Sequence, residues 1–124
     1  MIAEDNFWLA VDRLVEASTL IIDRPKGSPH PRHGSWRYPL DYGYLEETRA
    51  PDGDGIDVWR GSLAEARVTG VIITVDLDKG DGEFKLLLGC TANDARMALD
   101  VHNQGSQAGI LVIRPDTEKE GTHV

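Results

Sequence analysis

The chain has 124 residues, of which 40% are hydrophobic and 27% are charged, and its net charge is −8. This length and composition predict a single globular domain over residues 1–124 with one modest core. The negative charge argues against nucleic acid or an anionic membrane as a partner, because both bind basic surfaces.

The sequence gives no sign of secretion or of membrane insertion. No apolar run approaches the roughly 20 residues that span a bilayer, and residues 1–5 lack the basic and apolar segments of a signal peptide. The single cysteine, Cys90, lies in an apolar run and is expected to be a buried thiol rather than a nucleophile. We therefore expect a cytoplasmic protein.

The N-terminal third predicts a helix, a strand and a long loop. Apolar side chains at helical spacing predict an amphipathic helix over residues 5–16, capped by Asp5 or Asn6. Residues 19–23 are typical of a strand. Three prolines and two glycines make residues 25–35 a loop, because they disfavour both a central strand and a stable helix.

The rest of the chain predicts short strands and a second helix. Residues 42–44 are expected to form a turn, and residues 115–124 a frayed tail. A helix over residues 93–102 would be capped by Asn93. Strands are predicted over residues 36–38, 56–59, 66–75, 84–91 and 109–114. Several short strands with flanking helices favour a mainly β (α+β) fold built on a small closed or nearly closed barrel.

A glycine turn with three carboxylates precedes the strand at residue 56. It reads Asp52-Gly53-Asp54-Gly55-Ile56-Asp57. Converging carboxylates repel each other unless they are protonated, hydrated or neutralised by a cation, and Mg²⁺ prefers such oxygen ligands. A solvated β-turn is the alternative, since Asp-Gly is a common hairpin signal. An EF-hand is excluded because its twelfth position is Leu63 rather than glutamate.

A second acidic loop spans residues 76–85. It carries four carboxylates and ends in Lys85, and it connects two predicted strands. If antiparallel pairing brings it beside the first loop, the two would form a multi-metal site with a lysine at its edge, as in phosphoryl transfer. The alternative is a pair of solvated acidic hairpins.

Histidines and tryptophans carry weaker signals. His30, His33 and His102 lack the spacing of a structural zinc site and are expected to be exposed loop residues. In so acidic a chain the tryptophans are expected to be core or interface residues rather than base-stacking platforms. They are Trp8, Trp36 and Trp59.

Two motifs together resemble the signature region of the family I soluble inorganic pyrophosphatases. The segment Tyr38-Pro39-Leu40-Asp41-Tyr42-Gly43-Tyr44 is followed by the loop at residues 52–58, and Asp78, Glu83 and Lys85 follow at the family's spacing. The resemblance covers residues 21 to 91, with Gly55 in place of a proline and Glu83 in place of an aspartate.

The resemblance implies a five-stranded OB-like β-barrel with two flanking helices, and it assigns roles to residues. Asp54 would be the general base, with Tyr42 beside it, and Lys85 would bind phosphate. The implied Mg²⁺ ligands are Asp52, Asp57, Asp78 and Glu83, with Asp57 bridging two ions. Tyr38 would lie at the substrate.

The phosphate-binding half of the family pattern is altered. Residues 24–37 form a shorter, proline-broken segment, and the late Tyr-Lys pair of the family is missing. Basic residues in that segment are the natural replacements, because arginine and lysine both bind phosphate. They are Arg24, Lys26, Arg32 and Arg37.

The sequence thus predicts an enzyme of phosphate metabolism that hydrolyses inorganic pyrophosphate to two phosphates by a metal-activated water. Mg²⁺ is the expected ion, with Mn²⁺ as an alternative, and a small phosphate-containing substrate is the expected partner. The resemblance also implies self-association, for which the helix face around Trp8 could serve. Two alternatives remain open: a hydrolase of another phosphoanhydride such as a nucleotide, and a non-catalytic metal- or phosphate-binding relative.

Overall fold

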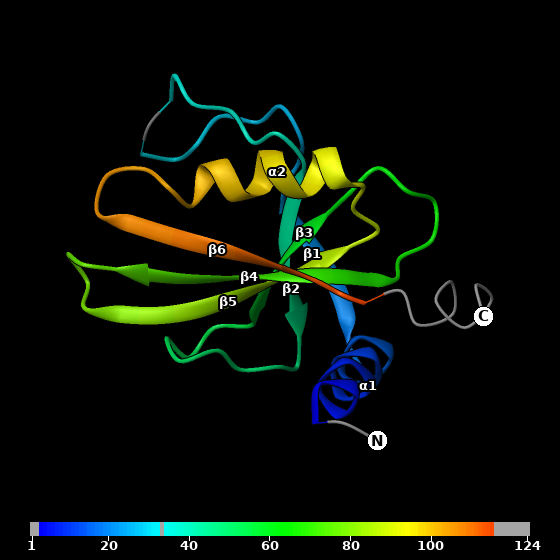
Figure 1. Ribbon diagram of the computed structural model, residues 1–124. Coiled ribbons are helices and arrows are strands. Elements are labelled where there is room, and N and C mark those ends of the chain that lie inside the picture. Colours follow the sequence, from blue (N-terminus) through cyan, green and yellow to red (C-terminus); the bar gives the residue numbers. More distant parts are fainter. Residues whose placement is uncertain (1–2, 33, 116–124) are drawn as a thin grey trace.

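The computed structural model describes residues 3–32 and 34–115, which form one six-stranded sheet with a helix on each side (Figure 1). The strand order is β1-β2-β3-β5-β4-β6, and β3 with β5 is the one parallel pair among the described strands. The elements are α1 (Ala3–Glu16), β1 (Thr19–Arg24), β2 (Asp41–Glu46), β3 (Ile56–Arg60), β4 (Val68–Asp76), β5 (Asp81–Leu88), α2 (Ala92–Val101) and β6 (Gln107–Ile113).

The predicted class, a mainly β fold with two flanking helices, is confirmed, although the sheet has six strands instead of five. Residues 42–44, predicted as a turn, lie in β2 instead. They pair with β1 on one side and with β3 on the other, and Gly43 permits the close approach of β1, since a Cβ atom there would collide with the carbonyl group of Ile21. The predicted strand at residues 36–38 is reduced to one isolated bridge between Pro29 and Arg37.

The predicted helices are present, but their N-caps differ from the prediction. α1 already begins at Ala3, so Asp5 and Asn6 lie inside it. In α2 the cap is Thr91 rather than Asn93. The Thr91 hydroxyl accepts the N–H of Asp94, and the Asp94 carboxylate accepts the N–H of Thr91. This reciprocal capping box satisfies two backbone donors at once and therefore defines the helix start.

The sheet is covered on both faces, so the core has two halves. On one face α1 contributes Trp8 and Val11 to a cluster with side chains of β2–β5. On the other face α2 packs on Trp59 and its neighbours. Consecutive residues of β5, Leu86, Leu87 and Leu88, are all buried because they point alternately into the two halves.

The predictions for Cys90 and for two of the three tryptophans are confirmed in the core. Cys90 is buried, and burial raises the pKa of its thiol to about 12, which keeps it un-ionised. Trp8 and Trp59 are core residues, whereas Trp36 is only partly buried. Beyond Pro115, the predicted tail lies outside the described residues. No described helix is long and apolar enough to cross a membrane.

Candidate functional site

The parallel pairing of β3 with β5 brings the two acidic loops together. Val58 pairs with Leu86, and continuing this register places Asp57 beside Lys85 and Gly55 beside Glu83. Because parallel strands start at the same edge of a sheet, the segments that precede β3 and β5 also meet there. The sequence predicts that antiparallel strands bring the two loops together. In the structure the parallel strands β3 and β5 do so.

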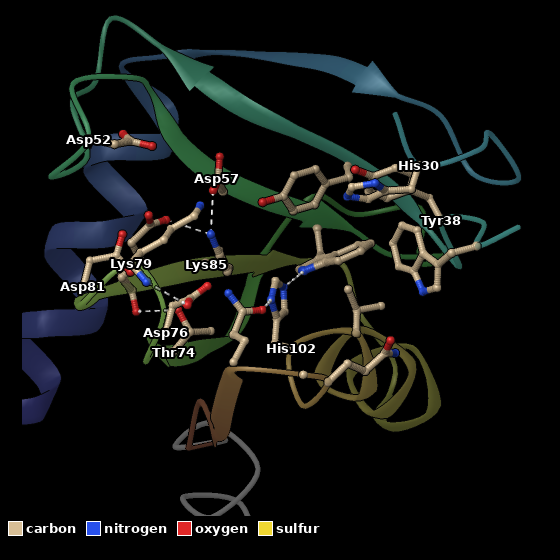
Figure 2. Close-up of a pocket in the computed structure, with 18 of the residues that line it drawn as sticks. His30, Tyr38, Asp52, Asp57, Thr74, Asp76, Lys79, Asp81, Lys85 and His102 are labelled. Carbon is tan, nitrogen blue, oxygen red and sulfur yellow. Dashed lines mark hydrogen bonds and ion pairs between the residues drawn. The ribbon is translucent and has the colours of Figure 1, made fainter. Parts of the chain in front are cut away.

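A cavity of about 760 Å³ opens on the face of the sheet that α2 covers. One end, here called the acidic end, is lined by Asp52, Asp57, Asp76, Asp81 and Glu83 with the two lysines Lys79 and Lys85. The other, the aromatic end, is lined by His30, Trp36, Tyr38, Tyr42 and Trp59. Figure 2 shows Asp52, Asp76 and Asp81 on one side of the Asp57–Lys85 pair, and His30 and Tyr38 on the other.

Lys85 occupies the centre of the acidic end. Its Nζ lies 2.7 Å from Asp57 Oδ2 and 2.8 Å from Glu83 Oε1, and the residue is 6% exposed. Burial alone disfavours the charged ammonium, but the charges of Asp57 and Glu83 and the hydrogen bonds to them outweigh it and raise the pKa of Lys85. The ammonium group is therefore a permanent, oriented positive charge facing the cavity.

The turn between β4 and β5 is organised by Asp76. Its Oδ1 accepts the N–H groups of Asp78 and Lys79 and the hydroxyl of Ser106, at 2.9 to 3.2 Å. These bonds, led by the one from Lys79, lower the pKa of Asp76 and keep it ionised. One carboxylate thus both fixes the turn and lines the cavity.

Tyr42 connects the two ends. Its ring stacks on Tyr38 with 5.6 Å between ring centres and contacts Trp59 at 4.5 Å. Burial, followed by the charge of Asp57 and a hydrogen bond to it, raises the pKa of Tyr42 well above its ordinary value. The phenol therefore stays protonated and can donate to the Asp57 carboxylate.

His102 lies beneath Trp59, between the two ends of the cavity. It is buried, whereas the sequence predicts an exposed residue. Its Nε2 accepts the indole N–H of Trp59 at 3.0 Å. Nδ1 consequently carries the proton and donates to Gln107 Oε1 at 2.9 Å. Burial lowers the pKa of His102 to about 4, so the ring is neutral. His30 lines the cavity and is partly buried, and His33 lies outside the described residues.

The structure gathers six of the ten predicted site residues around the cavity: Asp52, Asp57, Glu83, Lys85, Tyr38 and Tyr42. The other four do not line it. Asp54 and Asp78 are exposed on their loops, and their N–H groups donate to Asp52 and Asp76. Arg32 and Arg37 are exposed on the β1–β2 loop, where the Arg37 guanidinium donates to the carbonyl of Gly27.

Asp76, Asp81 and Lys79 line the cavity but were not singled out from the sequence. The signal that could have found two of them is the hairpin register. Asp76 and Asp81 are direct partners across β4 and β5, and Thr74, two residues earlier, lines the same cavity. Strand alternation places residues 74 and 76 on one face.

The acidic end carries the type of ligand that hard divalent cations prefer. Five carboxylates face two ammonium groups, and carboxylate oxygens are the preferred ligands of Mg²⁺. This excess negative charge would repel a phosphate ligand unless cations accompanied it. As arranged, no three acidic, histidine or cysteine side chains of the described chain form a group that could hold a metal ion. Lys85 neutralises part of the set instead.

Comparisons with known proteins agree with the motifs. No protein-family model matches the chain. An inorganic pyrophosphatase from Thermus thermophilus is 28% identical in an alignment that covers 69% of this chain and 61% of that protein. The chain thus spans about three fifths of the length of this curated relative.

Solved structures share the fold. An inorganic pyrophosphatase from Neisseria gonorrhoeae superposes with a TM-score of 0.58 at 21% identity, over 84% of this chain and 86% of that one. The enzyme from Helicobacter pylori gives 0.57 at 15% identity, over 82% and 86%. The chain therefore has the OB-like fold of these inorganic pyrophosphatases and is similar in sequence to one of them.

Proposed function

We propose that this chain hydrolyses inorganic pyrophosphate in a reaction that depends on Mg²⁺. The observation that carries the proposal is the cluster of Asp57, Glu83 and Lys85 on the parallel strands β3 and β5, which faces a cavity with three further carboxylates. Similarity to the pyrophosphatase of Thermus thermophilus supports the choice of substrate.

The carboxylates proposed to hold Mg²⁺ are Asp52, Asp57 and Glu83, with Asp76 and Asp81 beside them and Asp78 on the same turn. When bound, Mg²⁺ would neutralise phosphate charge and lower the pKa of the attacking water. Asp54 remains the proposed general base. It lies on the same loop as Asp52, whose carboxylate accepts its N–H at 3.0 Å.

The chain's own groups explain how pyrophosphate could be oriented. The Lys85 ammonium is held between two carboxylates and can turn its third donor toward a phosphate oxygen. Tyr42 donates to Asp57 and thereby fixes that carboxylate. Lys79 lines the same end and supplies a second positive charge. These contacts would supply part of the phosphate binding that the resemblance assigns to the Tyr-Lys pair, which this chain lacks.

Phosphate release from pyrophosphate, measured with Mg²⁺ or Mn²⁺, tests the proposal. Asp57→Asn removes a charge from the centre of the acidic end and should lower turnover by about 10² to 10⁴. Asp100→Asn is the matched control, since Asp100 is exposed on α2 and does not line the cavity. A chain that releases no more phosphate than its Asp57→Asn variant would refute the proposal.

The role of Asp54 has a separate test. Asp54→Asn should keep much of the Mg²⁺ affinity while it loses most of the rate, because an amide cannot accept a proton from water. Turnover close to that of the unchanged chain would identify another group as the base. Loss of metal binding would identify Asp54 as a ligand.

A further inference from the structure

The cavity extends beyond the groups proposed for pyrophosphate hydrolysis. A volume of about 760 Å³ lies within the range of sites that bind organic molecules. The charged groups that would hold phosphates and cations belong to the acidic end. The aromatic end adds a wall of rings that an inorganic diphosphate does not need.

The rings of this wall contact each other and face the cavity. Trp36 and Tyr38 meet edge to face, with 4.6 Å between their centres, and His30 lies 5.2 Å from Trp36. Tyr38 is almost fully buried beneath them, whereas Trp36 and His30 are only partly buried. A partly exposed indole in a cavity is a surface on which a flat organic group can stack.

The two ends share one continuous wall. Tyr42 interacts with Asp57 at the acidic end and stacks on Tyr38, which in turn contacts Trp36. Among the described lining residues, no arginine or lysine belongs to the aromatic end. This end therefore suits the uncharged part of a ligand whose anionic part lies at Lys79 and Lys85.

We infer that the cavity accepts a nucleoside triphosphate, with its base against Trp36 and His30 and its phosphates at the acidic end. Ser35 and Gln104 also line the cavity and offer polar groups to the edge of a base. The inference rests on the proposed function for its chemistry. A water oxygen would bond to one phosphorus, the bond from that phosphorus to the bridging oxygen would break, and the bridging oxygen would leave with the electron pair while the water's proton is released.

A substrate comparison tests the role of the base. Tripolyphosphate carries the same phosphate chain without a nucleoside, so the ratio of kcat/KM for ATP to that for tripolyphosphate reports the contribution of the nucleoside, and the Trp36 variant reports the contribution of base stacking. This ratio should exceed one and should fall about 5- to 100-fold in Trp36→Leu, which removes a stacking ring but keeps an apolar side chain. Phe7 is an exposed aromatic residue on α1 outside the cavity, so Phe7→Leu should leave the ratio unchanged. A ratio of one or less, or equal loss for both substrates in Trp36→Leu, would overturn the inference.

A binding experiment separates this inference from the proposed function. An imidotriphosphate analogue of ATP, which resists hydrolysis, should quench tryptophan fluorescence in the presence of Mg²⁺, and Trp36→Leu should weaken its binding by the same 5- to 100-fold. Binding that depends on Trp36 would support the inference even if pyrophosphate is not hydrolysed. Rapid pyrophosphate hydrolysis, together with analogue binding no tighter than that of tripolyphosphate, would overturn the inference alone.

Discussion

The two ends of the cavity are built in different ways. Asp57, Glu83 and Lys85 of the acidic end lie on β3 and β5, whose hydrogen-bonded register fixes their separation. His30, Trp36 and Tyr38 of the aromatic end lie on the connection between β1 and β2, outside the regular strands. The central cluster of Asp57, Glu83 and Lys85 thus stands on the sheet, with the loop residues Asp52 and Asp54 beside it. The rings proposed to stack on a base stand on a loop.

The loop is nevertheless ordered by its own backbone. The N–H of His30 donates to the carbonyl of Trp36 at 2.9 Å, and the N–H of Tyr38 donates to Ser28 at 3.1 Å. These bonds hold the aromatic side chains in place without a full strand pair. The aromatic end is therefore held by hydrogen bonds within a proline-containing loop, and the acidic end by the ladder between β3 and β5.

The largest expected effect concerns the acidic end. Lys85→Met removes the positive charge between Asp57 and Glu83, and it should lower pyrophosphate turnover by about 10² to 10³. Without their shared partner these two carboxylates repel each other, so calorimetry without phosphate should show tighter Mg²⁺ binding than in the unchanged chain. Arg96→Met, which removes a positive charge at an exposed position of α2 outside the cavity, is the control. Weaker Mg²⁺ binding in Lys85→Met would contradict the picture of a lysine that competes with the cation.

The sequence predicted the acidic end better than the aromatic end, for a physical reason. Asp57 and Lys85 belong to local motifs whose spacing is visible in the chain. The parallel pairing that brings them together is a long-range contact that no local sequence pattern indicates. The sequence therefore predicts antiparallel strands beside the two acidic loops. Asp76 and Asp81 line the cavity and Asp78 does not, and this difference likewise depends on the hairpin register.

Burial explains two further failures of sequence-based prediction. Tyr42-Gly43-Tyr44 has the composition of a turn, yet its pairing with β1 and β3 makes it a strand. His102 follows a helix and was expected in solvent, but the indole of Trp59 and the amide of Gln107 satisfy both of its ring nitrogens inside the protein. The strand depends on Ile21 and the burial of His102 depends on Trp59, and both partners are distant in the sequence.

The strand that joins the two ends should be sensitive to a single methyl group. In Gly43→Ala the added Cβ atom would collide with the backbone of Ile21, so β1 must move away from β2. We expect a loss of about 3 kcal/mol in the free energy of unfolding, measured with urea. Gly34→Ala is the control, because a Cβ atom there meets no atom within 4 Å. Equal stability of the two variants would show that β1 adapts at no cost.

The buried imidazole of His102 should make the free energy of unfolding depend on pH. The pKa of His102 falls from an ordinary 6.5 to about 4. Between these values the unfolded chain takes up a proton that the folded chain does not, so the free energy of unfolding decreases as the pH falls through this window. From pH 7 to about pH 4.5 the loss due to this group is about 2 kcal/mol. His102→Gln should lack this component in urea titrations at the two pH values, and an unchanged pH dependence would refute the assignment.

The smallest expected effect concerns the phenol between the two ends. Tyr42→Phe keeps the ring contacts with Tyr38 and Trp59 but removes the hydroxyl that donates to Asp57. A hydrogen bond to a carboxylate that is partly exposed to water contributes about 1 kcal/mol, so pyrophosphate turnover should fall only several-fold. If the ring acts separately as part of the aromatic wall, the ratio of nucleotide to tripolyphosphate kcat/KM should stay constant in Tyr42→Phe and fall in Tyr42→Leu. A fall of this ratio in Tyr42→Phe would mean that the hydroxyl also contributes to nucleotide binding. Tyr42 would then belong functionally to both ends of the cavity.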